Sequence, residues 1–332
     1  MPELPEVETI RRGLTQCIQG KKLERTEILC EKSFIGTPVA GEVAGRVTNL
    51  RRYGKALIID LDTGDSLMVH LRMTGQLIFD PDEKNIKTSG ALDPDPQNNK
   101  PRPELVVARF AAGHPSENFV ANLPNKQTRV ILRFENGTLY FNDQRKFGFI
   151  KVLKTSEVGD DPFIKKLAPE PWQMTPENFY RKLRKHQNSS IKAALLDQTI
   201  VAGLGNIYTD EALFMSRIHP EEKAGALTRQ QAARLLEMAC RVMELSIDSG
   251  GSTMKDYVKA DGTRGDYLDK FAQVFNKTGE LCPACGKAKI IKTKVAGRGT
   301  HICPNCQKLH PLDISSKVEA KATQKKQEGD HA

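Results

Sequence analysis

The sequence predicts an α+β protein of several domains, and three observations lead to this prediction. Strand-like apolar runs separated by turn signals occupy much of residues 43–153, which favours an antiparallel β-sandwich or barrel. From Thr175 onward the apolar residues recur at helical spacing instead. Two Cys-x-x-Cys pairs then stand near the C-terminus. A chain of 332 residues is long enough for two or three separate cores.

The first half is expected to carry one helix and a set of antiparallel strands. Apolar side chains repeat at helical spacing from Val7 to Ile18 and predict an amphipathic helix over residues 4–19. Asp-Thr-Gly-Asp at 62–65 and Glu-Asn-Gly at 135–137 predict hairpin turns. The expected strands are 43–50, 55–61, 66–71, 76–79, 129–134, 138–142 and 149–153.

Residues 80–128 interrupt the strand pattern and are expected to form a long surface insertion. Seven of the 18 prolines fall in this stretch, among Gly, Asn and Asp, which favours partial disorder with one short strand near 105–110. The second half is predicted to be helical at 176–186, 190–200, 206–215, 228–249 and 254–258. A flexible loop is expected at 261–265 and a disordered, highly charged tail at 311–332.

The pairs Cys282–Cys285 and Cys303–Cys306 have the spacing of a zinc site. Each pair can present two thiolates to one tetrahedral ion, and the spacer between them is long enough for a β-hairpin. Two disulfides in a secreted protein are the alternative. No apolar signal peptide opens the sequence, and the remaining cysteines are scattered and odd in number, so a reducing, cytoplasmic compartment and one structural Zn²⁺ are the better interpretation.

The charge of the chain points to a polyanionic partner. Lysine and arginine outnumber aspartate and glutamate by 50 to 41, and the excess is concentrated in the cysteine-rich segment 277–310 and in the run 181–186. Nucleic acid is the simplest partner for a basic hairpin at a zinc site, although a solvated helix face equally explains the second run. There is no apolar run of membrane-spanning length, so no membrane partner is expected.

The first residues suggest a nucleophile and a proton donor. Removal of Met1 would leave Pro2 as a secondary amine, with Glu3 and Glu6 close to it in sequence. An amine beside a carboxyl group is what Schiff-base chemistry on a sugar carbon requires. The alternative is that Pro5 only occupies a first helical turn, where acidic residues favour the helix dipole.

A glycine-rich turn stands between two predicted helices. Gly203 and Gly205 permit a tight backbone turn, and Asn206 would be a good N-cap for the helix that follows. Free backbone N–H groups at such a helix start could bind a phosphate, although glycines also serve ordinary helix–helix connections.

These segments together resemble a known family. Pro-Glu-Leu-Pro-Glu at the start, Arg-Lys-Phe-Gly at 145–148, Gly-Leu-Gly-Asn-Ile-Tyr at 203–208 and a finger holding Gly-Arg-Gly at 297–299 occur in this order. The pattern resembles the formamidopyrimidine-DNA glycosylase and endonuclease VIII family of base-excision repair, and it is most similar to the branch that removes oxidised purines. The implied domains are a catalytic β-sandwich at 1–155, a helix–two-turn–helix domain at 172–260, a lesion-covering loop and connection at 261–276 and a zinc finger at 277–310.

The resemblance also implies roles for individual residues. Pro2 corresponds to the nucleophile, Glu3 to the acid/base group, Glu6 to an acidic residue of the lesion pocket and Lys55 to a lysine that holds phosphate. In the same way, Asn206 and Arg298 correspond to the pair that grips the phosphate of the lesion, and Lys192 and Arg264 are expected at the DNA as well. Met73, Arg145 and Phe147 correspond to residues that fill the space left by a flipped nucleotide; without the resemblance, ordinary core packing would explain Met73 and Phe147.

The implied activity is a monomeric, bifunctional glycosylase and apurinic-site lyase acting on double-stranded DNA in the cytoplasm or nucleoid. Its expected substrates are 8-oxoguanine opposite cytosine and ring-opened formamidopyrimidines. One alternative is an endonuclease VIII-like enzyme for oxidised pyrimidines, which the combination of Met73, Arg145 and Phe147 disfavours. Another is a non-catalytic DNA-binding zinc protein, which the joint presence of Pro2, Glu3, Glu6 and Lys55 disfavours.

Overall fold

Helix α1 (Leu4–Ile18) opens the computed structural model, which describes residues 2–37, 42–82, 110–113, 122–252 and 267–309. Pro5 lies in its first turn, where the missing N–H costs no hydrogen bond. The Glu6 carboxylate accepts the backbone N–H of the N-cap residue Glu3 at 2.8 Å. The predicted helix over residues 4–19 is therefore confirmed.

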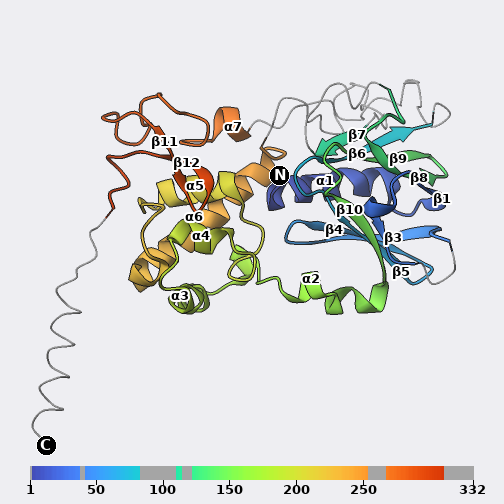
Figure 1. Ribbon diagram of the computed structural model, residues 1–332, viewed down its shortest axis with the longest axis horizontal. Coiled ribbons are helices and arrows are strands. Elements are labelled where there is room, and N and C mark those ends of the chain that lie inside the picture. The colour runs from blue at the N-terminus through green and yellow to red at the C-terminus, as the bar shows by residue number, and fades with distance from the viewer. Residues whose placement is uncertain (1, 38–41, 83–109, 114–121, 253–266, 310–332) are drawn as a thin grey trace, which may run out of the picture.

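The apolar face of α1 is enclosed by strands. In Figure 1, strands β6 to β9 lie on one side of α1 and strands β3 to β5 on the other. Ile10 and Leu14 are buried together with Leu77 from the first layer and Leu57 from the second. The strands are β1 (Lys22–Ile28), β2 (Phe34–Ile35), β3 (Gly45–Tyr53), β4 (Ala56–Leu61), β5 (Asp65–His70), β6 (Gly75–Pro81), β7 (Phe110–Gly113), β8 (Thr128–Phe134), β9 (Gly137–Asp143) and β10 (Phe149–Lys154).

The two layers are joined through one strand. The hydrogen-bonded order is β2-β10-β5-β4-β3-β1-β8-β9-β6-β7, and β1 pairs with β3 on one side and with β8 on the other. Every pairing is antiparallel except that of β2 with β10. The predicted antiparallel sandwich is confirmed, and the helix inside it brings the N-terminus to one end of the core.

Strand bounds agree with the sequence expectations within a few residues, with three differences. Strands β1 and β2 were not predicted. In β1 most residues are polar or charged and only Leu23 is buried, so its sequence shows no apolar pattern. Of the strand expected near 105–110 only Phe110 is among the described residues, where it begins β7 and is buried against α1. The rest of the insertion, the loop expected at 261–265, the helix expected at 254–258 and the tail lie outside the described residues.

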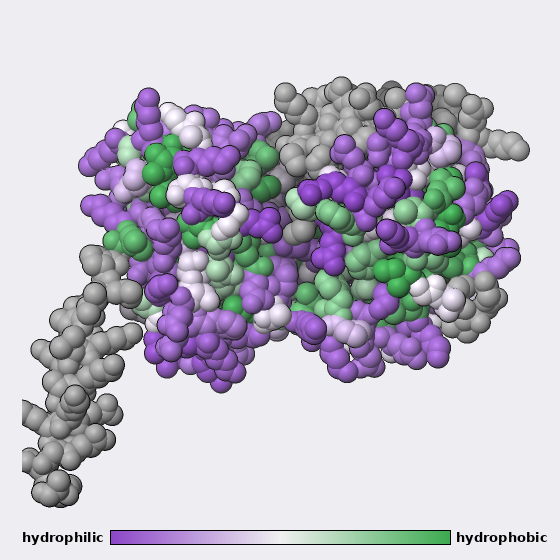
Figure 2. All heavy atoms as spheres, viewed as in Figure 1, coloured by the Kyte–Doolittle hydropathy of each residue, from purple (hydrophilic) through white to green (hydrophobic). Residues whose placement is uncertain are grey.

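The second half is helical and ends in a hairpin. Its helices are α2 (Pro162–Lys165), α3 (Pro176–Lys185), α4 (Ile191–Leu196), α5 (Asn206–Met215), α6 (Arg229–Asp248) and α7 (Tyr267–Lys270), followed by strands β11 (Ile291–Val295) and β12 (Arg298–Ile302). Helix α4 ends four residues before the predicted end, because the Asp197 carboxylate accepts the Thr199 N–H at 2.9 Å in a turn. Hydrophilic residues cover most of the visible face of both halves in Figure 2.

The chain start joins the two halves. Leu4 is fully buried in the apolar cluster of the helical half, with Phe179 and Leu204, although it belongs to α1. Its backbone N–H donates to the Gly203 carbonyl at 3.1 Å. Residues 2 and 3 therefore lie at the junction between the sandwich and the helices. In the described part of the chain, no helix is long and apolar enough to cross a membrane.

Candidate active site and zinc centre

The Glu3 carboxylate lies at the N-terminus of α5. One of its oxygens accepts the Gly205 N–H at 2.7 Å and the other accepts the Ile207 N–H at 2.9 Å. Only 3% of Glu3 is exposed. These N–H groups have no partner within the helix and lie at the positive end of the helix dipole, so they hold a carboxylate firmly. The structure thus brings Glu3 to the glycine-rich turn, which is 202 residues away in sequence at Gly205.

The two glycines of this turn allow the close approach. A Cβ at Gly205 would lie 2.3 Å from the Glu3 Cδ, and a Cβ at Gly203, whose φ is +97°, would lie 2.3 Å from a Leu4 methyl. Two expectations are corrected here. The N-cap of α5 is Gly205, not Asn206, and the N–H groups predicted to be free for a phosphate bind the protein's own carboxylate.

The environment of Glu3 favours its neutral form. Burial raises the pKa of Glu3 from 4.5 to about 7, with the positive charge of Lys55 opposing the rise and the negative charge of Glu6 adding to it. A carboxyl group with a pKa near 7 can hold a proton at neutral pH and release it, which is the property of a general acid/base.

Lys55 is held beside the same turn. Its ammonium donates to the Leu204 carbonyl at 2.6 Å, and the residue is 6% exposed. Burial lowers the pKa of Lys55, and the charges of Glu3 and Glu6 oppose that change. The structure therefore places Lys55 and Glu3 in one electrostatic cluster, as expected of two residues at one site.

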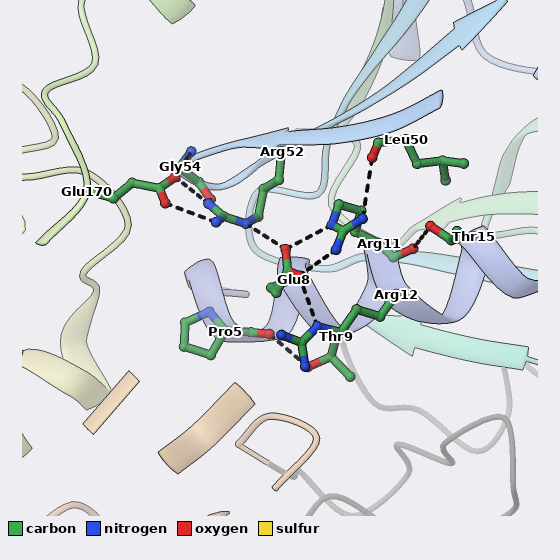
Figure 3. A network of polar contacts seen from close by, with 10 residues as sticks. All are labelled: Pro5, Glu8, Thr9, Arg11, Arg12, Thr15, Leu50, Arg52, Gly54 and Glu170. Atoms are coloured by element: carbon green, nitrogen blue, oxygen red, sulfur yellow. Dashed lines mark hydrogen bonds and ion pairs between the residues drawn. The ribbon is translucent and has the colours of Figure 1, made fainter. Parts of the chain in front are cut away.

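A network of ion pairs fixes the end of β3, just before the turn that carries Lys55 (Figure 3). Arg52 of β3 donates to Glu8 of α1 at 3.2 Å and, with both terminal nitrogens, to Glu170 of the segment leading into the helical half. Glu170 also accepts the Gly54 N–H at 3.0 Å. The turn just before Lys55 is thus attached to α1 and to the helical half at once.

Glu6 connects the N-terminus to the end of α6. One oxygen accepts the Glu3 N–H, and the other accepts the N–H and hydroxyl of Ser252 at 2.9 and 2.6 Å and the hydroxyl of Tyr208. Tyr208 lies 2.5 Å from the Ser246 hydroxyl. Both carboxylate oxygens of Glu6 therefore have partners within the protein.

Three exposed side chains meet at the tips of two turns. Met73 is 38% exposed and Phe147 is 55% exposed. The Arg145 guanidinium lies over the Phe147 ring at 5.0 Å and contacts the Met73 sulfur at 3.4 Å. Core packing, the alternative explanation for Met73 and Phe147, is therefore excluded. Asp143 fixes the second turn by accepting the N–H groups of Arg145 and Gly148 at 3.1 and 2.7 Å.

His70, which was not among the predicted site residues, shapes the first of these turns. Its Nδ1 accepts the Arg72 N–H at 3.0 Å, and Arg72 has a φ of 51° in the left-handed region. Burial lowers the pKa of His70 to about 3, so the ring is neutral and can accept this bond. A histidine three residues before Met73 was the available signal.

Arg298 opens strand β12 at the hairpin turn. The turn residues Ala296 and Gly297 have φ values of 51° and 73°, the geometry of a tight hairpin. Asn206 donates from its side-chain amide to the Gly299 carbonyl at 2.9 Å. The start of α5 therefore contacts the residue that follows Arg298 in the hairpin.

Lys192 requires a correction. The sequence analysis expected it at the DNA, but its side chain is fully buried. The ammonium donates to Asp210 at 2.6 Å, to the Thr300 hydroxyl at 2.8 Å and to the Gly299 carbonyl at 3.2 Å. A lysine with no exposed surface cannot contact a phosphate directly. Arg264, also expected at the DNA, lies outside the described residues.

The four cysteines of the finger form a tetrahedral ligand set. The sulfur atoms of Cys282, Cys285, Cys303 and Cys306 lie within 4.8 Å of one another. The Cys282–Cys306 and Cys285–Cys303 sulfur pairs are each 3.8 Å apart, which is the edge of a tetrahedron with zinc–sulfur bonds of about 2.3 Å. All four cysteines are free, so the disulfide alternative is not supported. Four thiolates leave no open position, so the zinc that they fit is structural.

Three family models match consecutive parts of the chain. They describe the formamidopyrimidine-DNA glycosylase N-terminal domain at residues 1–150, the formamidopyrimidine-DNA glycosylase H2TH domain at 167–258 and a zinc finger found in FPG and IleRS at 279–309. The fold and the zinc centre thus define a multidomain DNA glycosylase with a C-terminal finger. The chain belongs to the formamidopyrimidine-DNA glycosylase family.

Individual relatives agree along the whole chain. The formamidopyrimidine-DNA glycosylase of Pelotomaculum thermopropionicum is 36% identical over 93% of this chain and 100% of its own length. That of Streptococcus pyogenes serotype M3 is 37% identical over 94% of this chain and 100% of its own. A Lactococcus lactis FPG mutant solved with a DNA containing Fapy-dG has a TM-score of 0.74 at 33% identity, covering 92% of this chain and 100% of that one. The MutM (FPG) protein of Thermus thermophilus has a TM-score of 0.73 at 33% identity, covering 93% and 100%.

Proposed function

We propose that this chain is a bifunctional DNA glycosylase and apurinic-site lyase that removes 8-oxoguanine and formamidopyrimidines from double-stranded DNA. The observation that carries the proposal is the buried Glu3 carboxyl group, adjacent to Pro2 in sequence, at the start of α5. Its pKa of about 7 suits a group that gives up a proton and takes it back at neutral pH.

The proposed reaction begins at the Pro2 amine, which removal of Met1 would free. The amine attacks C1′, the bond between C1′ and the damaged base breaks, and the base leaves with the proton of the amine. Glu3 protonates the oxygen of the sugar ring as the C1′–O4′ bond breaks, and the nitrogen lone pair then forms an iminium ion at C1′. It withdraws electrons and acidifies the C2′ protons, so the 3′ and then the 5′ phosphate are eliminated. In this proposal zinc serves only to order the hairpin.

Damaged DNA would be held by the remaining groups. A base in the stack cannot reach Pro2, so the nucleotide must be flipped out at a cost of a few kcal/mol. The exposed Met73 and Phe147 are placed to fill the gap, and Arg145 between them can hydrogen-bond the orphaned base, with a preference for cytosine. Lys55, Asn206 and Arg298 would bind the phosphates around the lesion.

One chain carries all the groups that the proposed reaction uses, which supports a monomer. The free cysteines support a reducing compartment such as the bacterial cytoplasm or nucleoid.

We also infer the domain limits 1–155, 172–260 and 277–310. Their support is that β10 ends at Lys154 and that the hairpin with its cysteines lies within 277–310.

Borohydride trapping tests the proposal. The chain is incubated with end-labelled duplex DNA carrying one 8-oxoguanine opposite cytosine, and a covalent adduct mapped to Pro2 is expected. Pro2→Gly should lose it. Adduct formation only on thymine-glycol DNA would transfer the activity to oxidised pyrimidines. No adduct on either duplex, from protein that binds DNA, would mean a non-catalytic DNA-binding protein.

A further inference from the structure

One buried ion pair joins the finger hairpin to the helix that holds the catalytic carboxylate. Lys192 of α4 and Asp210 of α5 are fully buried, and their charged atoms lie 2.6 Å apart. Helix α5 begins at Asn206, and its N-terminal N–H groups hold Glu3. Asp210 lies one turn further along the same helix, so this pair has a fixed relation to the catalytic end of α5.

Both partners of the pair extend to strand β12. The second oxygen of Asp210 accepts the His301 N–H at 2.9 Å. Lys192 donates to the Thr300 hydroxyl at 2.8 Å, and that hydroxyl donates in turn to the Arg298 carbonyl at 3.0 Å. A continuous path of hydrogen bonds therefore runs from α5 to the backbone of Arg298. In Figure 1, β12 lies beside α5.

The Gly299 carbonyl accepts hydrogen bonds both from this path and from Asn206, a residue proposed to bind DNA. It accepts from Lys192 at 3.2 Å and from the Asn206 amide at 2.9 Å. One peptide group thus fixes the hairpin against both α4 and the first residue of α5. A hairpin anchored in this way cannot slide along α5 without breaking several bonds at once.

Stability alone is a poor explanation for the pair. Removing two charges from water costs several kcal/mol per ion, and well-packed apolar residues are often as stable as a buried ion pair. What an ion pair with additional hydrogen bonds supplies is a defined geometry, because each remaining donor and acceptor has one partner at one distance. Here the partners follow Arg298 in β12: the Gly299 carbonyl, the Thr300 hydroxyl and the His301 N–H.

We infer that Asp210 is a positioning residue for Arg298. Through its ion pair with Lys192, it holds the Arg298 guanidinium beside Asn206, so that both side chains can bind the same DNA phosphate. The inference rests on the proposed function for the role of Arg298. The pair itself does not touch DNA. Its loss should therefore act only through Arg298, and this distinguishes positioning from general support of the fold.

A double-mutant cycle with DNA that cannot be cleaved tests the inference. The dissociation constant for a duplex with a tetrahydrofuran abasic analogue is measured against salt for wild type, Asp210→Asn, Arg298→Ala and the double variant. Arg298→Ala is expected to weaken binding on the order of tenfold to hundredfold and to lower the salt slope by about one. Asp210→Asn should give a similar loss of slope, and adding it to Arg298→Ala should change nothing further.

The inference would be overturned if the losses of affinity caused by Asp210→Asn and Arg298→Ala were independent and multiplied in the double variant. An unchanged salt slope in Asp210→Asn would overturn it as well. Zinc content is measured in every sample, since one zinc per chain shows that the finger is intact. If Asp210→Asn does not fold, Thr300→Val serves in its place, because it removes only the hydroxyl that links Lys192 to Arg298; an unchanged slope in that variant also overturns the inference.

A matched control comes from the sandwich. Asp161, the residue before α2, pairs with Lys151 of strand β10 in the sandwich at 2.5 Å and is buried like Asp210, but its side-chain partners are Lys151 and Phe163 and not groups of β12. Asp161→Asn should leave the salt slope unchanged. Because the analogue is not cleaved, the cycle is informative even if wild type fails the borohydride test, and failure of the proposed function is thereby kept separate from failure of this inference.

Discussion

Gly205→Ala is the substitution that tests the catalytic geometry most directly. The φ of Gly205 is −129°, so alanine can adopt the backbone conformation without strain. The added Cβ would nevertheless lie 2.3 Å from the Cδ of Glu3 and 2.6 Å from its Cγ and Oε1. The substitution therefore acts on the Glu3 side chain and not on the turn itself.

The expected magnitude follows from these distances. Ordinary contact begins at 3.4 Å, so the Glu3 carboxyl group must retreat by about 1 Å, and a displacement of that size can cost about 100-fold in rate. The retreat also weakens the hydrogen bonds from Gly205 and Ile207, which stabilise the charged form. The pKa of Glu3 should therefore rise further as the rate falls.

Single-turnover base release from 8-oxoguanine duplex DNA measures the effect, with borohydride trapping in parallel. Gly159→Ala is the control, because a Cβ at Gly159 meets nothing within 4 Å, and this variant should behave as wild type. A Gly205→Ala protein that releases base at the wild-type rate would refute the assignment of Glu3 as the acid/base group held by this turn.

Three further outcomes are expected. Since burial raises the pKa of Glu3 to about 7 and the proposed reaction uses its protonated form, kcat/KM should fall as pH rises through about 7, and an unchanged rate up to pH 9 would contradict that role. Burial opposes ionisation of Glu8, but hydrogen bonds from Arg11 and then Arg12 lower the pKa of Glu8 from 4.5 to about 2. The stabilisation by Glu8 is therefore complete above pH 4.5 and is lost as pH falls toward 2. Glu8→Gln should lower the free energy of unfolding, measured by urea denaturation, by roughly 1–2 kcal/mol at pH 7 after solvent screening, and by much less at pH 3. Equal losses at both pH values would argue against an ionic role. Chelating zinc should abolish DNA cleavage while the circular dichroism of the sandwich persists, and full activity of a verified zinc-free sample would show that the finger is dispensable.

Local patterns predicted the elements well wherever one face of an element is apolar. The period of α1 and the apolar runs in the strands of the sandwich gave bounds within a few residues. The pattern failed for β1, because a strand with one buried residue, Leu23, has no readable alternation. It also failed to mark His70, whose effect depends on a single bond to Arg72 in a left-handed conformation.

Lys192 shows why residue roles are harder to predict than elements. A lysine on a predicted helix of a DNA-binding protein is normally exposed, and the residues that bury this one are Asp210 and Thr300, from elements distant in sequence. The same holds for the glycine-rich turn, whose N–H groups were predicted to be free and are used by Glu3. Partners of this kind are fixed by packing between domains, which periodicity does not encode.

The sequence by itself determined the sandwich, the helical half, the zinc ligands and the family, because each depends on spacing along the chain or on short motifs. Only the tertiary structure decided which groups share the site. Glu3, Lys55 and Leu204 come together because α1 enters the core of the helical half at Leu4. The Gly299 carbonyl of β12 reaches the Asn206 amide because buried charges hold β12 against α5. Burial then set the pKa of Glu3 near 7, since desolvation depends on every neighbour in space.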